Sequence, residues 1–179
     1  DYASALGKEA GRDHPGRVAL PDNLDVGVVG LESLLQLADE VGLHAFCVGE
    51  HHRRDFAISA PEVVLGAIAS RTSRILLGSA VTVLSTDDPV RVFQRFSTVD
   101  ALSNGRAEVI LGRGSFTESY PLFGFDLSRY DELFEDRLRL FAELRKPGPV
   151  TWSGTTRSAI AGATMYPPIE NGTLRTWVG

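Results

Sequence analysis

The chain has 179 residues, of which 43% are hydrophobic and 23% charged, and its 18 Lys and Arg against 23 Asp and Glu give a net charge of -5. This composition is ordinary for a globular protein, and the absence of any basic block longer than two residues argues against a nucleic-acid-binding surface. No apolar run approaches the roughly 20 residues of a membrane helix, and no secretory signal is recognisable. The single cysteine, Cys47, excludes a disulfide framework and a cysteine zinc cluster, so a reducing compartment, the cytoplasm, is the simplest prediction.

Residues 1–30 are predicted to form an irregular N-terminal segment. Three glycines and two prolines fall between positions 7 and 21, with scattered charges and little apolar periodicity, which is typical of loops. Only the stretch 17–20 has the character of a strand.

From Leu31 onward helices and strands alternate. The helices follow from apolar residues at helical spacing, and the strands are short and apolar on most positions, as expected for strands covered on both faces. The predicted elements are a helix over 31–41, a strand over 44–49, a helix over 61–71, a strand over 74–84, a helix between 87–89 and 103–105, a strand over 107–111, a helix over 127–146 and a strand over 174–178.

Two local features of these helices are specific enough to test. Ser59, Pro61 and Glu62 have the spacing of a capping box at the start of the helix over 61–71. In the helix over 127–146 a buried stripe is predicted, with the charged residues, Arg137 among them, on a solvated face. The stripe consists of Tyr130, Leu133, Phe134, Leu138, Phe141 and Leu144.

This alternation is typical of a parallel α/β sheet with about four strands. A closed barrel of this kind needs eight strands and typically about 250 residues. The sequence therefore predicts either an open sheet or a portion of a longer chain. The stretch 154–171, with two adjacent prolines, is predicted to run over the surface.

Polar clusters follow three of the predicted strands, at 49–52, 85–88 and 112–115. In parallel α/β folds the carboxyl ends of strands form the functional site. The first cluster, Glu50-His51-His52, resembles a metal site, but adjacent histidines on an extended chain point to opposite sides and chelate one ion poorly. The alternative is one histidine at the strand mouth and the other bonded to a neighbouring loop. A remoter reading is a metal-dependent hydrolase using Glu50, His51 and Asp88.

The other candidates each have two readings. Gly112-Arg113-Gly114-Ser115 is an anion-binding turn, or Arg113 pairs with a surface carboxylate. The small residues over 79–81 let a flat ring approach the backbone, or they fit a tapering barrel core. Cys47, mid-strand, is predicted to be a small buried hydrophobe rather than a nucleophile.

Taken together, several motifs closely resemble the bacterial luciferase-like monooxygenases. They are GEHH at 49–52, GSAVTVLSTDDPVR at 78–91, SNGRAEVILGRGS at 103–115, and TWSG followed by TWVG. The resemblance implies a (β/α)8 TIM barrel, of which residues 31–179 form the N-terminal half to two thirds. It implies a flavin-dependent oxidoreductase that uses reduced FMN, or a deazaflavin in some relatives, and O2 to oxidise a small organic substrate. It further implies a separate flavin reductase and a homodimer, with no metal.

By residue, the resemblance matches His51 to the family's active-site histidine and Ala80-Val81 to its non-proline cis peptide beneath the flavin ring. Arg113 matches the arginine that grips the flavin phosphate, with the backbone amide near Ser115 beside it. Glu118 lies in the same loop and is expected to face the ring or the substrate. The alternative function is a truncated or degenerate relative that binds flavin without catalysis.

Overall fold

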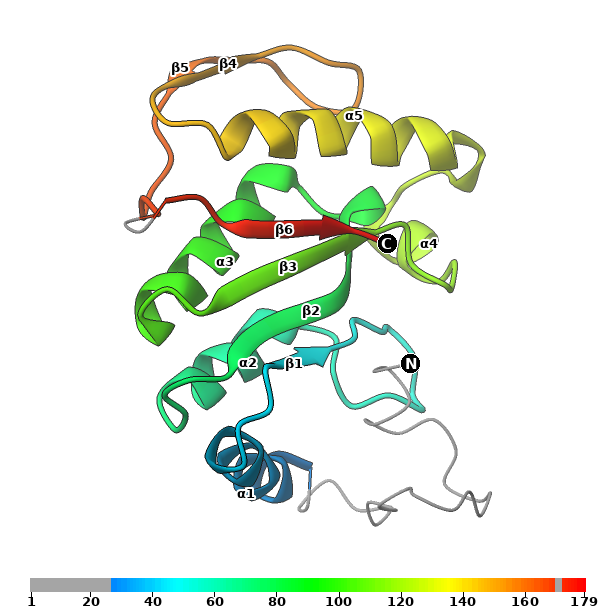
Figure 1. Cartoon of the computed structure of the whole chain (residues 1–179). Helices are drawn as coiled ribbons and strands as arrows, with labels where there is room; N and C mark the ends of the chain where they lie inside the picture. Colours follow the sequence, from blue (N-terminus) through cyan, green and yellow to red (C-terminus); the bar gives the residue numbers. More distant parts are fainter. Residues whose placement is uncertain (1–26, 170–171) are drawn as a thin grey trace.

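In the computed structural model of the chain, which describes residues 27–169 and 172–179, a four-stranded parallel sheet carries the other elements (Figure 1). The strand order is β1-β2-β3-β6. The helices are α1 (Gly27–Glu40), α2 (Pro61–Ala69), α3 (Pro89–Ser103), α4 (Ser119–Phe123) and α5 (Tyr130–Leu144), with short 3-10 turns η3 (Leu84–Thr86) and η4 (Leu127–Arg129). The strands are β1 (Ala45–Val48), β2 (Leu76–Val83), β3 (Ala107–Gly112), β4 (Val150–Trp152), β5 (Ile160–Ala163) and β6 (Arg175–Val178).

The predicted alternation of helices and strands is confirmed, and all neighbouring strands of the main sheet pair in parallel. Helix α3 shows how the sequence sets these boundaries. Asp88 caps its start by accepting hydrogen bonds from the backbone N–H groups of Val90 and Arg91 at 2.8 and 3.3 Å. Asn104 ends it in the left-handed conformation, with φ at 58°.

The two faces of the sheet differ in what covers them. One face carries apolar side chains such as Val48, Leu77 and Val109, which pack with the helices in the main core. On the other face Glu108 links two strands, since it accepts hydrogen bonds from Cys47 Sγ at 3.8 Å and Trp177 Nε1 at 3.3 Å. In a closed barrel this second face is the interior.

Cys47 is buried, as predicted. Burial, together with the charge of the neighbouring Glu108 carboxylate and its hydrogen bond, raises the pKa of the thiol to about 11.

Asp39, at the end of α1, fastens this helix to the turn that leads into β2. Its carboxylate accepts from the backbone N–H groups of Ser73, Arg74 and Ile75 at 2.8, 2.9 and 2.7 Å. Burial raises the pKa of this carboxyl, but the three N–H groups and the Ser73 hydroxyl outweigh that effect and lower the pKa to about 2.

The described part of the stretch 154–171, residues 154–169, is more structured than predicted. Strands β4 and β5 pair in antiparallel fashion and lie on the side of α5 away from the sheet (Figure 1). Asp136 on α5 holds the loop between them by accepting from the backbone N–H groups of Thr155 and Thr156 at 3.3 and 3.0 Å. A three-residue strand with one buried side chain gives too short a pattern to be recognised in the sequence.

The predicted capping box at α2 is wrong. Ala60, not Ser59, is the N-cap residue, and no side chain caps this end. Glu62 instead turns toward α3, where it accepts a hydrogen bond from Arg95 Nε at 3.1 Å. The Glu62 side chain therefore forms an ion pair between α2 and α3 instead of the hydrogen bond to the helix start that the capping-box motif predicts.

Helix α5 also departs from its predicted surface. Arg137 is not solvated: it is only 4% exposed, its Nη1 donates to the carbonyl oxygen of Ser85 at 2.6 Å, and its guanidinium lies 4.3 Å from the centroid of Phe125. Leu140, outside the predicted stripe, is buried, whereas Tyr130 and Leu138 are only half-buried. An arginine is buried here because the turn after β2 offers it carbonyl acceptors.

The predicted N-terminal segment can be compared only at its end. Residues 27–30 belong to α1, four residues before the predicted boundary at 31. The stretch 17–20 lies outside the described residues. Within the part of the chain that the structure describes, no helix is long and apolar enough to cross a membrane.

Candidate functional site

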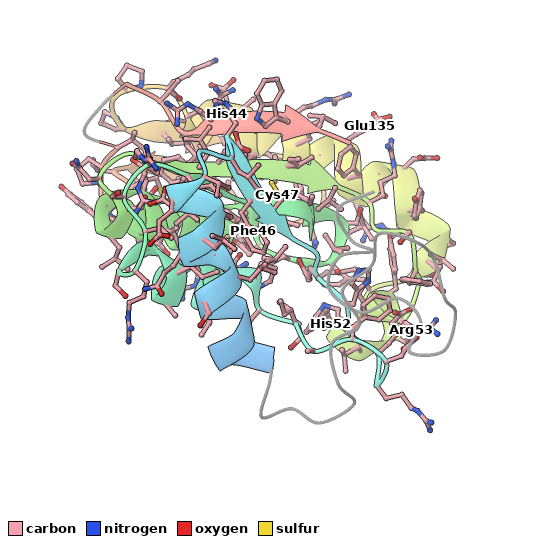
Figure 2. The ribbon with its side chains drawn as sticks, turned by 60° about the horizontal axis from the view of Figure 1, so that its bottom comes forward. His44, Phe46, Cys47, His52, Arg53 and Glu135 are labelled. Atoms are coloured by element: carbon pink, nitrogen blue, oxygen red, sulfur yellow. The ribbon has the colours of Figure 1, made fainter. Side chains whose placement is uncertain are left out.

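The carboxyl ends of β1, β2 and β3 meet at one edge of the sheet and enclose a pocket. Figure 2 shows His52 and Arg53 beyond one end of β1, with His44 at its other end. The pocket is lined by Glu50, His51, His52, Val83, Gly114, Ser115, Phe116, Glu118 and Ser119. The first and third polar clusters of the sequence therefore do come together.

Glu50 and His52 form a nearly buried pair in the lining of this pocket. His52 Nε2 donates to Glu50 Oε1 at 2.9 Å, and the backbone N–H of Val83 donates to Glu50 Oε2, also at 2.9 Å. Burial raises the pKa of the Glu50 carboxyl, and the two hydrogen bonds oppose that rise. The alternative reading places one histidine in a hydrogen bond to a neighbouring loop, but His52 bonds Glu50 within its own loop.

Two side chains of the hypothetical metal-dependent hydrolase site, Glu50 and Asp88, make other hydrogen bonds. Both oxygens of Glu50 accept hydrogen bonds, and Asp88 caps α3. Among residues 27–169 and 172–179, no three or more His, Cys, Asp and Glu side chains are grouped so that they could hold a metal ion.

His51 packs its ring against two phenylalanine rings. Its backbone N–H donates to Ile58 at 3.0 Å, and its ring stacks on Phe56, with the centroids 3.8 Å apart and 25° between the planes. Phe116 contacts it edge-on at 5.5 Å. Gly49 makes this placement feasible, because a Cβ there would lie 3.0 Å from His51 Nε2 and 3.6 Å from the Ala80 carbonyl oxygen.

The peptide bond between Ala80 and Val81 is cis, which confirms the geometry expected from the resemblance. The β2–β3 pairing shifts register between Ala80 and Thr82. On either side of this bond Ser79 and Thr82 are fully buried and bonded to each other at 2.8 Å, whereas Ala80 and Val81 are half-exposed. The strand thus presents two small apolar side chains beside the pocket.

Arg113 packs flat on α5 at the end of β3. Its guanidinium carbon lies 4.3 Å from the centroid of Phe134, and its Nε lies 3.6 Å from a carboxylate oxygen of Asp131, whose side chain is 79% exposed. The contact with a surface carboxylate is therefore present. Even so, among the described residues Arg113 Nε is buried and has no hydrogen-bond acceptor.

Ser119, which the sequence analysis did not single out, has the same property. Its hydroxyl is buried in the lining of the pocket and has no hydrogen-bond partner among the described residues. A buried donor without an acceptor is costly. Two such donors, one directly after β3 and one at the start of α4, fit the binding of an anionic group, such as the phosphate of a flavin mononucleotide.

The structure gathers His51, Ser115 and Glu118 in the pocket lining, whereas Ala80, Val81 and Arg113 do not line it. Arg113 directly precedes the lining residues Gly114 and Ser115 in the chain, and Val83 of the strand that carries Ala80 and Val81 also lines the pocket. The roles assigned to these residues stay predictions.

Comparisons with known proteins agree with this geometry. The model of the luciferase-like monooxygenase family matches residues 21–179. The chain therefore belongs to the luciferase-like monooxygenases.

Among curated proteins, the chain is similar in sequence to several monooxygenases. The chain is 32% identical over 156 residues to N-acetyl-S-alkylcysteine monooxygenase of Bacillus subtilis, covering 74% of this chain and 47% of the relative. It is 32% identical over 88 residues to the oxygenase component of flavin-dependent trigonelline monooxygenase of Acinetobacter baylyi, covering 49% of this chain and 24% of the relative. The chain thus spans less than half the length of these relatives.

Solved structures share the fold, so the chain has the architecture of part of a TIM barrel. Monooxygenase RslO1 of Streptomyces bottropensis superposes with a TM-score of 0.81 at 23% identity, over 88% of this chain and 48% of that one. The oxygenating constituent of 3,6-diketocamphane monooxygenase of Pseudomonas putida, in complex with FMN, gives 0.75 at 16% identity, over 92% and 47%. An F420-dependent secondary alcohol dehydrogenase gives 0.70 at 19%, over 84% and 47%.

Proposed function

We propose that this chain supplies half of the active site of a flavin-dependent monooxygenase, which uses reduced FMN and O2 to oxidise a small organic molecule. The observation that carries the proposal is the buried Nε of Arg113, which has no hydrogen-bond acceptor among the described residues and lies 3.6 Å from the exposed Asp131 carboxylate. It stands at the same sheet edge as His51 and the half-exposed pair Ala80-Val81.

The residues at the sheet edge suit the different parts of such a cofactor. Arg113 and Ser119 offer donors for the phosphate, since a charge-assisted hydrogen bond to a phosphate is among the stronger ones. Ala80 and Val81 offer a smooth apolar surface for a flat ring. Bound in reduced form, the flavin supplies the electrons with which O2 is activated.

The chain's own contribution to the reaction lies in protons and in exclusion of water. We assign proton exchange in the reaction to His51, an imidazole in the pocket lining, because histidine is a common general acid and base. Phe56 and Phe116 pack around its ring and keep solvent away from that side.

The names of similar proteins support the finer points of the proposal. The trigonelline relative is named as an oxygenase component, which fits a separate reductase that delivers reduced flavin. The FMN complex of one structural neighbour supports FMN, and the F420-dependent neighbour keeps a deazaflavin as the alternative cofactor. A homodimer, a cytoplasmic location and the residue roles are part of the proposal.

Flavin titration of the complete gene product tests the proposal. We expect reduced FMN to bind and Arg113→Met to weaken binding by about tenfold to a hundredfold, the value of one charge-assisted hydrogen bond. Arg139→Met is the matched control, because Arg139 lies on α5, is 75% exposed and pairs with the exposed Glu135.

Turnover separates the two candidate functions. With reduced FMN, O2 and an organic substrate, His51→Ala should slow turnover by about a hundredfold and leave flavin affinity nearly unchanged. Flavin binding without any turnover would favour the alternative, a non-catalytic flavin-binding relative. Protein that binds neither FMN nor a deazaflavin would refute both.

A further inference from the structure

Glu50 stands where the hydrogen-bond ladder between β1 and β2 stops. The last paired residues of this ladder are Val48 and Ser79. Strand β2 continues to Val83, but beyond Ser79 its pairing runs to β3 alone. On the β1 side the Glu50 carboxylate replaces the missing backbone acceptor, since its Oε2 accepts a hydrogen bond from the Val83 N–H at 2.9 Å.

The second oxygen of Glu50 extends the connection to α4. His52 Nε2 donates to Oε1 at 2.9 Å, and the two side chains are 10% and 9% exposed. The His52 ring in turn meets Phe123 edge-on, with the centroids 4.9 Å apart. One carboxylate therefore ties together the loop after β1, the end of β2 and the last residue of α4.

The connected segments are those that carry the proposed chemistry. Glu50 precedes His51 directly, and Val83 lies two residues after Val81. We infer that Glu50, with His52 as its second donor, is a positioning residue that fixes His51 relative to the Ala80-Val81 surface. This inference rests on the proposed function, because it gives Glu50 control of the distance between His51 and the proposed position of the flavin ring.

Three variants of the complete gene product test the inference. Glu50→Gln retains an oxygen for the Val83 N–H, and its amide N–H donates to His52 Nε2 when the His52 ring carries its proton on Nδ1, so it should preserve the connection. Glu50→Ala removes it. His52→Gln places an amide N–H near the position of Nε2 and should act as the conservative replacement. Glu135→Ala, an exposed carboxylate on α5, is the control.

Two measurements report on the site rather than on the amount of folded protein. The first is amide hydrogen exchange at Val83, and the second is the fraction of reduced FMN consumed that yields oxidised substrate instead of hydrogen peroxide. We expect Glu50→Ala to speed Val83 exchange by about tenfold or more and to lower this fraction severalfold, since one charge-assisted hydrogen bond is lost. Glu50→Gln and His52→Gln should stay within about threefold of the unmodified protein in exchange.

The outcomes are separable. Unchanged Val83 exchange in Glu50→Ala would overturn the connection itself. Faster exchange with an unchanged oxidised fraction would overturn the positioning role. Unmodified protein that binds no flavin would instead overturn the proposed function, and Val83 exchange would still decide whether Glu50 holds β2.

Discussion

Gly112 is the position at which one added methyl group should damage the site most directly. A Cβ built there would lie 2.6 Å from Val81 Cγ2 and 3.0 Å from Val81 Cβ. Carbon atoms pack best at about 3.5–4.0 Å, so Val81 must move by about 1 Å. Because Val81 is β-branched, it has few alternative rotamers, and the backbone of β2 must yield instead.

The expected cost of Gly112→Ala follows from this contact. Overpacking of this kind destabilises proteins by about 1–3 kcal/mol. Gly112 pairs with Val83 across the β2–β3 ladder and directly precedes Arg113. The shift should therefore also weaken flavin binding, by about tenfold if 1.4 kcal/mol of the cost falls on the bound state. Urea unfolding and flavin fluorescence titration measure the two effects.

Gly66→Ala is the matched control for this substitution. Gly66 lies inside α2, and beyond the helix's own backbone the atom nearest to its added Cβ is Leu102 Cδ1 of α3 at 3.8 Å, an ordinary van der Waals distance. We expect it to stabilise the protein by about 0.5–1 kcal/mol, as alanine does in helices, and to leave flavin affinity unchanged. If Gly112→Ala behaved like Gly66→Ala in both assays, the contact between Val81 and β3 described above would be wrong.

Three further predictions concern buried polar groups. Arg137→Met should destabilise the protein by about 2 kcal/mol in urea, because it leaves a buried carbonyl of the turn after β2 without its donor, whereas Arg139→Met should change stability by less than about 0.5 kcal/mol; equal midpoints would contradict the burial of Arg137. The Asp39 carboxyl has a lower pKa in the folded state than when unfolded, so its stabilisation is present above about pH 4 and fades as the pH falls toward 2. The stability difference between unmodified protein and Asp39→Asn should shrink over that range, and a constant difference would argue against the carboxylate's role. Cys47, with its pKa raised to about 11, should be alkylated by iodoacetamide at pH 8 far more slowly than a free thiol, and Glu108→Gln should speed the reaction.

The sequence was most informative where one residue settles the local backbone. Asp88 before Pro89 and Asn104 after Ser103 bound α3 where the pattern predicts, since a cap is made with neighbours along the chain. The strands were found for a similar reason, because strands covered by helices are apolar at nearly every position.

Side chains that form their main contacts with another element were predicted wrongly. Glu62 has the spacing of a capping residue but pairs with Arg95 on α3. Arg137 lies among charged neighbours but is buried against carbonyl groups some 50 residues away in the chain, with Ser85 as its closest acceptor. In both cases the deciding partner comes from another element, and a local pattern carries no information about it.

By itself the sequence determined the order of the elements, the polar clusters after three strands and the resemblance to luciferase-like monooxygenases. Each of these is a matter of short-range spacing. Only the tertiary structure decided that Glu50 holds Val83, that His51 stacks on Phe56, and that a buried nitrogen of Arg113 has no acceptor among the described residues. These facts depend on which strands lie side by side and how deeply each side chain is buried, and packing fixes both only when the chain has folded.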